Sequence, residues 1–179
     1  MSSRLQLQDL TFLNNPARFT DGIKLEIVFE LVEDLPGEFE WELVYVGDPA
    51  SEEGDQVLES VVVGPVPKGR HKIILEAGAP DASKIAQDDL RGCTVLFLTC
   101  KYEEQKFVKV GYYVSVDYNE EELLENPPET VDISKLERCV KTDDVRVTNY
   151  AIKWTKDEQP EEIQEEQQEE EEEGIAMEE

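Results

Sequence analysis

The sequence is poor in residues that support enzymatic catalysis. Its one histidine, His71, is accompanied by no serine or cysteine motif that would make it the base of a nucleophile. Gly64 and Gly69 have phosphate-loop spacing, but Arg70 and His71 follow where such a loop needs a lysine and a hydroxyl residue leading into a helix. We therefore expect a protein that is not an enzyme and that binds no cofactor.

Metal ligands, paired cysteines and long apolar runs are also scarce. Glu52, Glu53 and Asp55 lack the glycine and the terminal glutamate of a calcium loop, so we expect solvated loop acids. Cys93 and Cys100, two of three cysteines, fall on opposite faces of one expected strand, which favours reduced thiols in an intracellular protein. No run reaches the roughly 18 apolar residues of a membrane span, and the N-terminus lacks a hydrophobic signal region.

Positive charge is scarce as well, because 17 lysines and arginines stand against 43 acids, for a net charge of −26. Residues 156–179 hold 13 of those acids and one lysine. Such a segment buries too little apolar surface to offset its ordering entropy, so we predict a disordered acidic tail, 156–179, after a folded core, 1–155. The charge favours a basic protein partner over nucleic acid, whose phosphates it repels. Acidity for solubility alone is the alternative.

Alternation of apolar and polar residues predicts strands over most of the core. Residues 23–31 and 39–45 alternate with charged residues on one side, as expected of strands with one wet face. In residues 5–13 the apolar positions change parity, which predicts a bulge or bend near Asp9. Similar patterns predict further strands over residues 56–63, 71–77, 93–102, 106–116 and 145–154.

Turn and helix signals separate these strands. Glu103 and Glu104 are expected to form the tip of a hairpin. Short helices are expected over residues 82–90, 119–125 and 134–140. In the last of these, Ser134 and Glu137 would form a capping box. Many strands at short spacing with small helical connectors predict an all-β, antiparallel sandwich.

Residues 93–100 are apolar on both faces, whereas a strand in a two-layer sandwich needs one apolar face. Val95 and Phe97 lie on one face, and Leu96 and Leu98 lie on the other. Either a loop or helix covers the outer face, or that face is an exposed patch that docks a partner.

The residues expected near this strand suit the docking alternative. The next strand carries Lys109 and Tyr113 at one parity, so both would flank Val95 if the two strands pair. Nearby loops carry acids, which are Asp55, Asp88 and Asp89. An apolar centre with an acidic rim fits a basic amphipathic helix.

Several long strings of the core resemble the anti-silencing-function (Asf-type) histone chaperone family. They are EDLPGEFEWELVYVGDPASEEGDQVLESVVVGPVPKGRHK at 33–72, KVGYYV at 109–114, ELLENPP at 122–128 and RVTNYAIKW at 146–154. The resemblance covers residues 1–155 and implies an immunoglobulin-like β-sandwich. It also implies a protein that binds the dimer of histones three and four without ATP or catalysis and serves nucleosome assembly and disassembly.

The resemblance further implies three binding surfaces. The surface for the C-terminal helix region of histone three maps to Val46, Asp55, Asp89, Val95, Phe97, Lys109 and Tyr113. The surface to which histone four adds a strand maps to Leu7, Tyr112, Arg146, Val147 and Thr148. The surface for basic hairpins of deposition chaperones maps to Gly37, Glu38, Val61, Val63 and Ile73.

Two of these positions depart from the family pattern. Lys109 stands where the family usually has arginine, and lysine keeps the charge but loses the fork that grips a carboxylate bidentately. Gly37 stands where many members have a polar or acidic residue, which leaves Glu38 as the main anchor of the third surface.

The leading hypothesis is a monomeric nuclear histone chaperone that can also shuttle through the cytoplasm. It would shield the tetramerisation surface of the histone dimer and pass the dimer to replication-coupled and replication-independent deposition chaperones. The alternative is an acidic immunoglobulin-like adaptor for another basic partner, and this alternative leaves the Val95 face covered.

Overall fold

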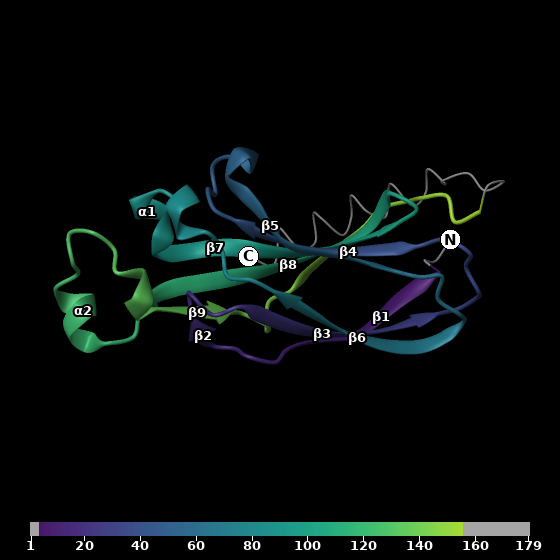
Figure 1. The fold of residues 1–179 in the computed structure, drawn as a ribbon, viewed down its shortest axis with the longest axis horizontal. Coiled ribbons are helices and arrows are strands. Elements are labelled where there is room, and N and C mark those ends of the chain that lie inside the picture. The colour runs from purple at the N-terminus through teal and green to yellow at the C-terminus, as the bar shows by residue number, and fades with distance from the viewer. Residues whose placement is uncertain (1–3, 156–179) are drawn as a thin grey trace.

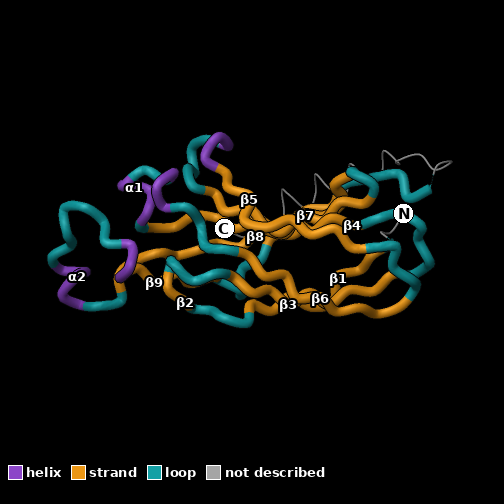
Figure 2. The backbone as a smooth tube through the Cα atoms, in the orientation of Figure 1, coloured by secondary structure: helices purple, strands orange, loops and turns teal. Residues whose placement is uncertain are grey.

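The computed structural model describes residues 4–155, so the predicted acidic tail, residues 156–179, lies outside the described residues. Strands make up most of the described chain, and helices are short (Figure 2). The strands are β1 Leu5–Phe12, β2 Ala17–Arg18, β3 Ile23–Leu31, β4 Phe39–Val46, β5 Asp55–Val63, β6 Gly69–Ala77, β7 Gly92–Tyr102, β8 Gln105–Tyr118, β9 Leu136–Val140 and β10 Arg146–Asn149. The helices are η1 Glu52–Gly54, η2 Ala82–Lys84, α1 Gln87–Leu90, α2 Glu121–Glu125 and η3 Ile133–Lys135.

Two antiparallel sheets lie one above the other, as Figure 1 shows. The smaller sheet has the order β1-β3-β6, and the larger has the order β2-β9-β8-β7-β4-β5. One edge of β8 is shared, because β9 pairs with Val114–Tyr118 and β10 pairs with Val108–Gly111. The predicted fold class, an all-β immunoglobulin-like sandwich, is confirmed.

The predicted inward positions form the core between the sheets. In β4, Phe39, Trp41, Leu43 and Tyr45 are buried, while the residues between them are partly exposed. Phe29 of β3 contacts Trp41 across the sandwich, with ring centroids 5.5 Å apart. Each such side chain contributes about 1.5–3 kcal/mol by leaving water, so the alternating pattern fixes which face of each sheet turns inward.

The predicted bulge near Asp9 is confirmed, since the β1–β3 register shifts between Leu7 and Asp9. The predicted helix over 82–90 is two short pieces, η2 and α1, with extended backbone at Ile85 and Ala86. Ile85 is buried, and an extended residue there turns its side chain into the core.

The predicted helix over 134–140 is wrong. Residues 136–140 are strand β9, which pairs with β8 and buries Leu136, Arg138 and Val140 in alternation. The capping box is wrong too, because Asp132 Oδ1 accepts from the backbone N–H of Ser134 at 3.1 Å. The strand is favoured over the helix because it pairs with the edge of β8. In the strand, the buried Arg138 guanidinium also donates to three backbone carbonyls, those of Phe19, Asp21 and Gly22.

The predicted last strand, 145–154, ends early, at Asn149. The chain then runs on beside the β7–β8 hairpin. Gln105 Nε2 donates to the carbonyl of Lys153 at 2.8 Å, and the Lys153 N–H donates to Gln105 Oε1 at 3.0 Å. Trp154 stacks on Tyr102 with centroids 5.3 Å apart, so this segment closes one end of the core instead of extending the sheet.

Candidate functional site

A hollow of about 290 Å³ lies on the outer face of the larger sheet. Leu96 and Leu98 of β7 point inward and are buried, whereas Val95 and Phe97 are half-buried and line the hollow. The full lining is Val95, Phe97, Lys109, Gly111, Tyr112, Tyr113, Arg146, Thr148 and Tyr150. The second apolar face of residues 93–100 therefore opens on a hollow, which favours the docking alternative over a covered face.

Gly111 gives the Phe97 ring its room. The two residues are register partners on β8 and β7, and a Cβ at position 111 would lie 3.3 Å from Phe97 Cε1. That spacing is tighter than an ordinary van der Waals contact. Glycine thus lets the ring approach the sheet and keeps the floor of the hollow shallow and apolar.

Two cations stand over aromatic rings in the hollow. Lys109 Nζ lies 4.0 Å from the centroid of Phe97, and Arg146 Cζ lies 4.8 Å from the centroid of Tyr113. Strand register explains the placement, because Phe97 and Arg146 both pair with Gly111, from its two sides. Lys109 and Tyr113 lie two residues before and after Gly111, on the same face of β8. Cations held against ring faces keep their charge next to apolar surface, an arrangement that suits a ligand with both apolar and acidic groups.

Acids stand beside this hollow. Asp55 follows η1 and pairs with Val46, and its pKa is raised mainly by burial and also by the charge of Glu52, while the charge of Lys109 lowers it. Asp89 is half-buried in α1, the helix that precedes β7. In Figure 1, α1 and the loop before β5 lie at the same end of the sandwich. The structure therefore places acids of the first predicted surface at one end of its apolar strand.

A second groove, of about 510 Å³, lies between β1 and β10. Leu7 and Val147 of the second predicted surface both line it. Arg146 and Thr148 line the hollow instead, and so does Tyr112, which is 2% exposed and packs edge-on against Phe12 at 4.9 Å. The second surface is therefore divided between the two faces of β10, which lies at an edge of the sheet beside β8.

The third predicted surface lies where the edge strands β5 and β6 approach each other. Val61, Val63 and Ile73 are half-buried there and pack against the core. Glu38 is next to the end of β5, because a Cβ built on Gly64 would lie 3.1 Å from the Cα of Glu38. The structure thus brings the apolar and the acidic members of this surface together.

Sequence reasoning missed two features of the hollow. Arg146 and Thr148 were assigned to the second surface alone, and Tyr150 was not singled out, yet all three line the hollow. The signal was their spacing of two, which on an extended segment places side chains on one face. The predicted strand over 145–154 already placed these three side chains on one face.

The arrangement is suited to binding. Among residues 4–155 no three or more histidine, cysteine and acidic side chains gather as a metal site would require, and Cys93, Cys100 and Cys139 are free thiols. Within the same range, no helix is long and apolar enough to cross a membrane. An apolar hollow flanked by cations and acids, on a rigid sandwich with an edge strand beside it, defines a protein-binding domain.

Comparison with known proteins identifies the family. Residues 2–155 match the family described as ASF1 like histone chaperone, and the chain belongs to that family. It is 52% identical over 160 residues to the probable histone chaperone asf-1 of Caenorhabditis elegans, covering 89% of this chain and 58% of the relative. It is 45% identical over 152 residues to histone chaperone asf1b of Xenopus tropicalis, covering 85% and 76% of the two chains.

A third relative matches along nearly its full length. Histone chaperone asf1 of Dictyostelium discoideum is 44% identical over 152 residues, covering 85% of this chain and 99% of the relative. By contrast, the chain covers 58% and 65% of the two Caenorhabditis elegans relatives. The family points to histone binding and to a role at chromatin.

Proposed function

We propose that this protein is a monomeric, non-enzymatic histone chaperone that binds the dimer of histones three and four. In this proposal it shields the surface through which two such dimers form a tetramer, and it passes the dimer to deposition chaperones in the nucleus. The observation that carries the proposal is the hollow beside Val95, because a β-sandwich has no structural need for a strand that is apolar on its outer face.

The hollow is proposed to bind the C-terminal helix region of histone three. Its floor, Val95 and Phe97, offers apolar contact, and Lys109 and Arg146 offer charge to acidic groups of the helix. Asp55 and Asp89, near one end, offer charge to basic groups. Such mixed charge around an apolar centre fixes the direction in which an amphipathic helix lies.

The edge of β10 is proposed to receive an extended segment of histone four. An edge strand supports β-addition, in which backbone hydrogen bonds supply affinity and a pocket selects a side chain. The groove between β1 and β10, with Leu7 and Val147 in its lining, is the nearest apolar pocket. It is wide enough, at about 510 Å³, for an aromatic or aliphatic side chain.

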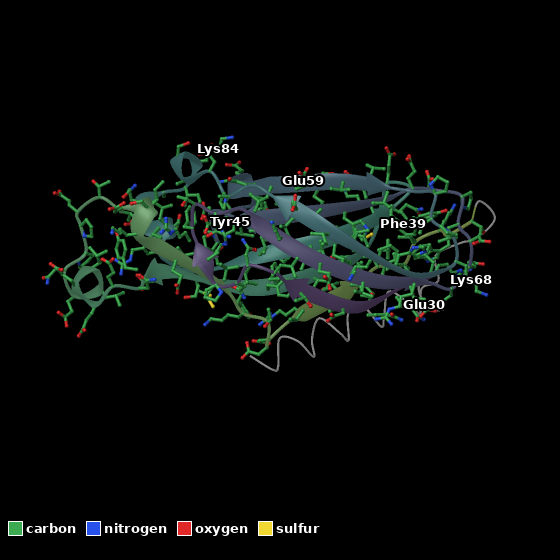
Figure 3. The ribbon with its side chains drawn as sticks, turned by 60° about the horizontal axis from the view of Figure 1, so that its bottom comes forward. Glu30, Phe39, Tyr45, Glu59, Lys68 and Lys84 are labelled. Atoms are coloured by element: carbon green, nitrogen blue, oxygen red, sulfur yellow. The ribbon has the colours of Figure 1, made fainter. Side chains whose placement is uncertain are left out.

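The surface at Glu38, Val61, Val63 and Ile73 is proposed to bind a basic hairpin of a deposition chaperone. Figure 3 supports a ternary complex, because Phe39 and Tyr45 lie well apart along β4. Glu38 precedes Phe39, whereas Tyr45 pairs with Leu96, the neighbour of Val95.

Residues 156–179 are proposed to be a separate acidic tail that attracts histones, and residues 1–155 are proposed to be the binding core.

The test is a pull-down of the purified histone dimer with Val95→Arg. We expect loss of binding with no loss of folding, because Val95 is half-buried on the outer face, where an arginine fits without entering the core. Ile74→Arg is the matched control, since Ile74 is 52% exposed and lies on β6 in the other sheet. A folded Val95→Arg protein that binds histones normally would show that the hollow is not the site.

A further inference from the structure

The hairpin surface contains a carboxylate that the sequence did not point to, that of Glu103. Glu103 lies 65 residues from Glu38, in the turn between β7 and β8, yet its Oε1 accepts the backbone N–H of Glu38 at 3.1 Å. The backbone N–H of Glu103 in turn donates to the carbonyl of Glu38 at 3.1 Å. One hydrogen bond therefore holds the side chain of Glu103, and the other holds its backbone, beside the start of β4.

Gly37 leaves the space that this carboxylate occupies. A Cβ at position 37 would lie 2.1 Å from Glu103 Oε1 and 2.7 Å from both Cγ and Cδ. A side chain at position 37 would therefore displace the carboxylate of Glu103 from the position that it takes here. Gly37 itself is held by its N–H, which donates to the hydroxyl of Tyr102 at 3.0 Å.

The turn that carries Glu103 has a strained backbone. Glu103 and Glu104 have φ of 48° and 65°, the left-handed region that two-residue hairpin turns require and that glycine or asparagine usually fills. Glutamate at such positions costs of order 1 kcal/mol or more each, and such cost tends to occur at functional positions. Here the strained residue that contacts Glu38 presents an exposed carboxylate.

The charge of Glu103 is felt by its surroundings. Burial raises the pKa of Tyr102, the charges of Glu103 and Glu33 raise it further, and the hydrogen bond from Gly37 acts in the opposite direction. Glu103 and Glu33 therefore both bring negative charge to Tyr102, whose hydroxyl accepts from the N–H of Gly37.

We propose that Glu103 is a second anchor for the basic hairpin, its carboxylate acting with that of Glu38 on an arginine or lysine of the partner. The proposal rests on the hairpin surface proposed above and names the residue that determines its selectivity for positive charge. Glu38 by itself offers a basic side chain one carboxylate, whereas Glu38 and Glu103 together offer it two, from two loops that meet at this corner. Gly37 contributes by its lack of a side chain, which admits Glu103.

The test is isothermal titration of a synthetic basic β-hairpin peptide, taken from a deposition chaperone, into the full chain. Glu103→Gln should weaken affinity about tenfold, since it removes the charge but keeps an oxygen that accepts the Glu38 N–H. Glu104→Gln makes the same charge change in the same turn and should stay within about twofold of wild type. Gly37→Ala changes no charge. It should also lower the affinity for the peptide, because the new Cβ displaces Glu103.

All three variants should bind the histone dimer as the wild type does, and the two glutamine variants should melt at the wild-type temperature. If Glu103→Gln binds the peptide normally while Glu38→Lys does not, the surface stands and the role of Glu103 is overturned. If wild-type protein does not bind the peptide, or if Glu38→Lys also binds it normally, the hairpin surface itself is overturned, and the role of Glu103 with it.

Discussion

Single side chains decide the character of the proposed histone hollow. Gly111 admits the Phe97 ring, and the ring in turn receives the ammonium of Lys109 at 4.0 Å. Arginine would reach the same ring as a planar fork, whereas lysine is a point charge that contacts an acid through single hydrogen bonds. The cation–π contact is worth about 0.5–2 kcal/mol and holds the lysine in place before a ligand arrives. This offsets part of what is lost with the arginine fork.

Tyr45 makes stability depend on alkaline pH. It is 2% exposed and burial raises its pKa to about 12, against the opposing charge of Arg138. The unfolded chain loses this proton near pH 10 and the folded protein near 12, so stability is complete below pH 10 and is lost as pH rises towards 12. Two pKa units correspond to about 2–3 kcal/mol.

Urea unfolding at pH 9, 10.5 and 11.5 measures this effect. Tyr45→Phe should lose less stability over that range than wild type, while Tyr112, whose pKa burial also raises, is present in both proteins. Equal losses in the two proteins would mean that Tyr45 does not carry the dependence.

At the scale of elements, strict alternation was a more reliable guide than weak helical signals, although the helix predicted over 119–125 is present as α2. Residues 23–31 were predicted as a strand and are β3 to the residue. Residues 134–140 contain a cap-like serine and acid, but their helix would have left the end of β8 without β9 and Arg138 without its three carbonyls. Tertiary pairing, which no local pattern contains, overrode a weak local preference.

The same distinction applies to the proposed sites: contacts between neighbouring strands could be predicted from the sequence, and contacts between distant loops could not. Parity within residues 93–116 was enough to bring Val95, Phe97, Lys109 and Tyr113 together, because adjacent antiparallel strands fix each other's register. The contact of Glu103 with Gly37 joins two loops far apart in the sequence, so it depends on the pairing of β4 with β7, which sets Phe39 opposite Tyr102. Spacing within a segment carries no information about such a contact.

The two ends of β4 predict two independent binding events. Glu38 is four residues from Glu42, or about 13 Å along a strand, and Lys109 lies level with Glu42 two strands away, because Thr99 pairs with both. The two charges that the variants reverse are therefore further apart than a Debye length of about 8–10 Å. Glu38→Lys should therefore weaken binding of the basic hairpin peptide and leave binding of the histone dimer unchanged. Lys109→Glu should weaken binding of the histone dimer and leave binding of the peptide unchanged. Isothermal titration of both variants with both ligands measures this.

Equal losses for both ligands in either variant would indicate one shared site or a folding defect. A circular-dichroism melt of each variant separates these explanations. Loss of one ligand alone is the outcome that permits a ternary hand-over complex.

At the scale of the whole molecule, charge and shape are distributed differently. The shape features, which are the hollow, the groove and the hairpin surface, all belong to residues 4–155. Of the net charge of −26, residues 156–179 contribute −12, from 13 acids and one lysine. Residues 1–155 contribute the other −14, from 30 acids and 16 lysines and arginines, over a much longer stretch. Negative charge is therefore most concentrated in residues 156–179, while the specific contacts belong to residues 4–155, and a truncation can separate the two.

Deletion of residues 156–179 should leave the melting temperature nearly unchanged, because this segment has no apolar periodicity with which to pack on the core. It should slow histone association at low salt by about tenfold or less and change the dissociation rate little, since the tail acts before contact forms. The deficit should shrink as salt rises from 50 to 300 mM, because screening shortens the reach of the tail in the intact protein.

Stopped-flow association with the histone dimer at each salt concentration measures the rate. The matched control for total charge is a full-length chain in which the glutamates of 156–179 are replaced by glutamines, and it should behave as the deletion does. A deletion that lowers the melting temperature by several degrees would show that the segment packs on the core. A glutamine-substituted tail that keeps the wild-type rate would show that length, and not charge, sets the rate of encounter.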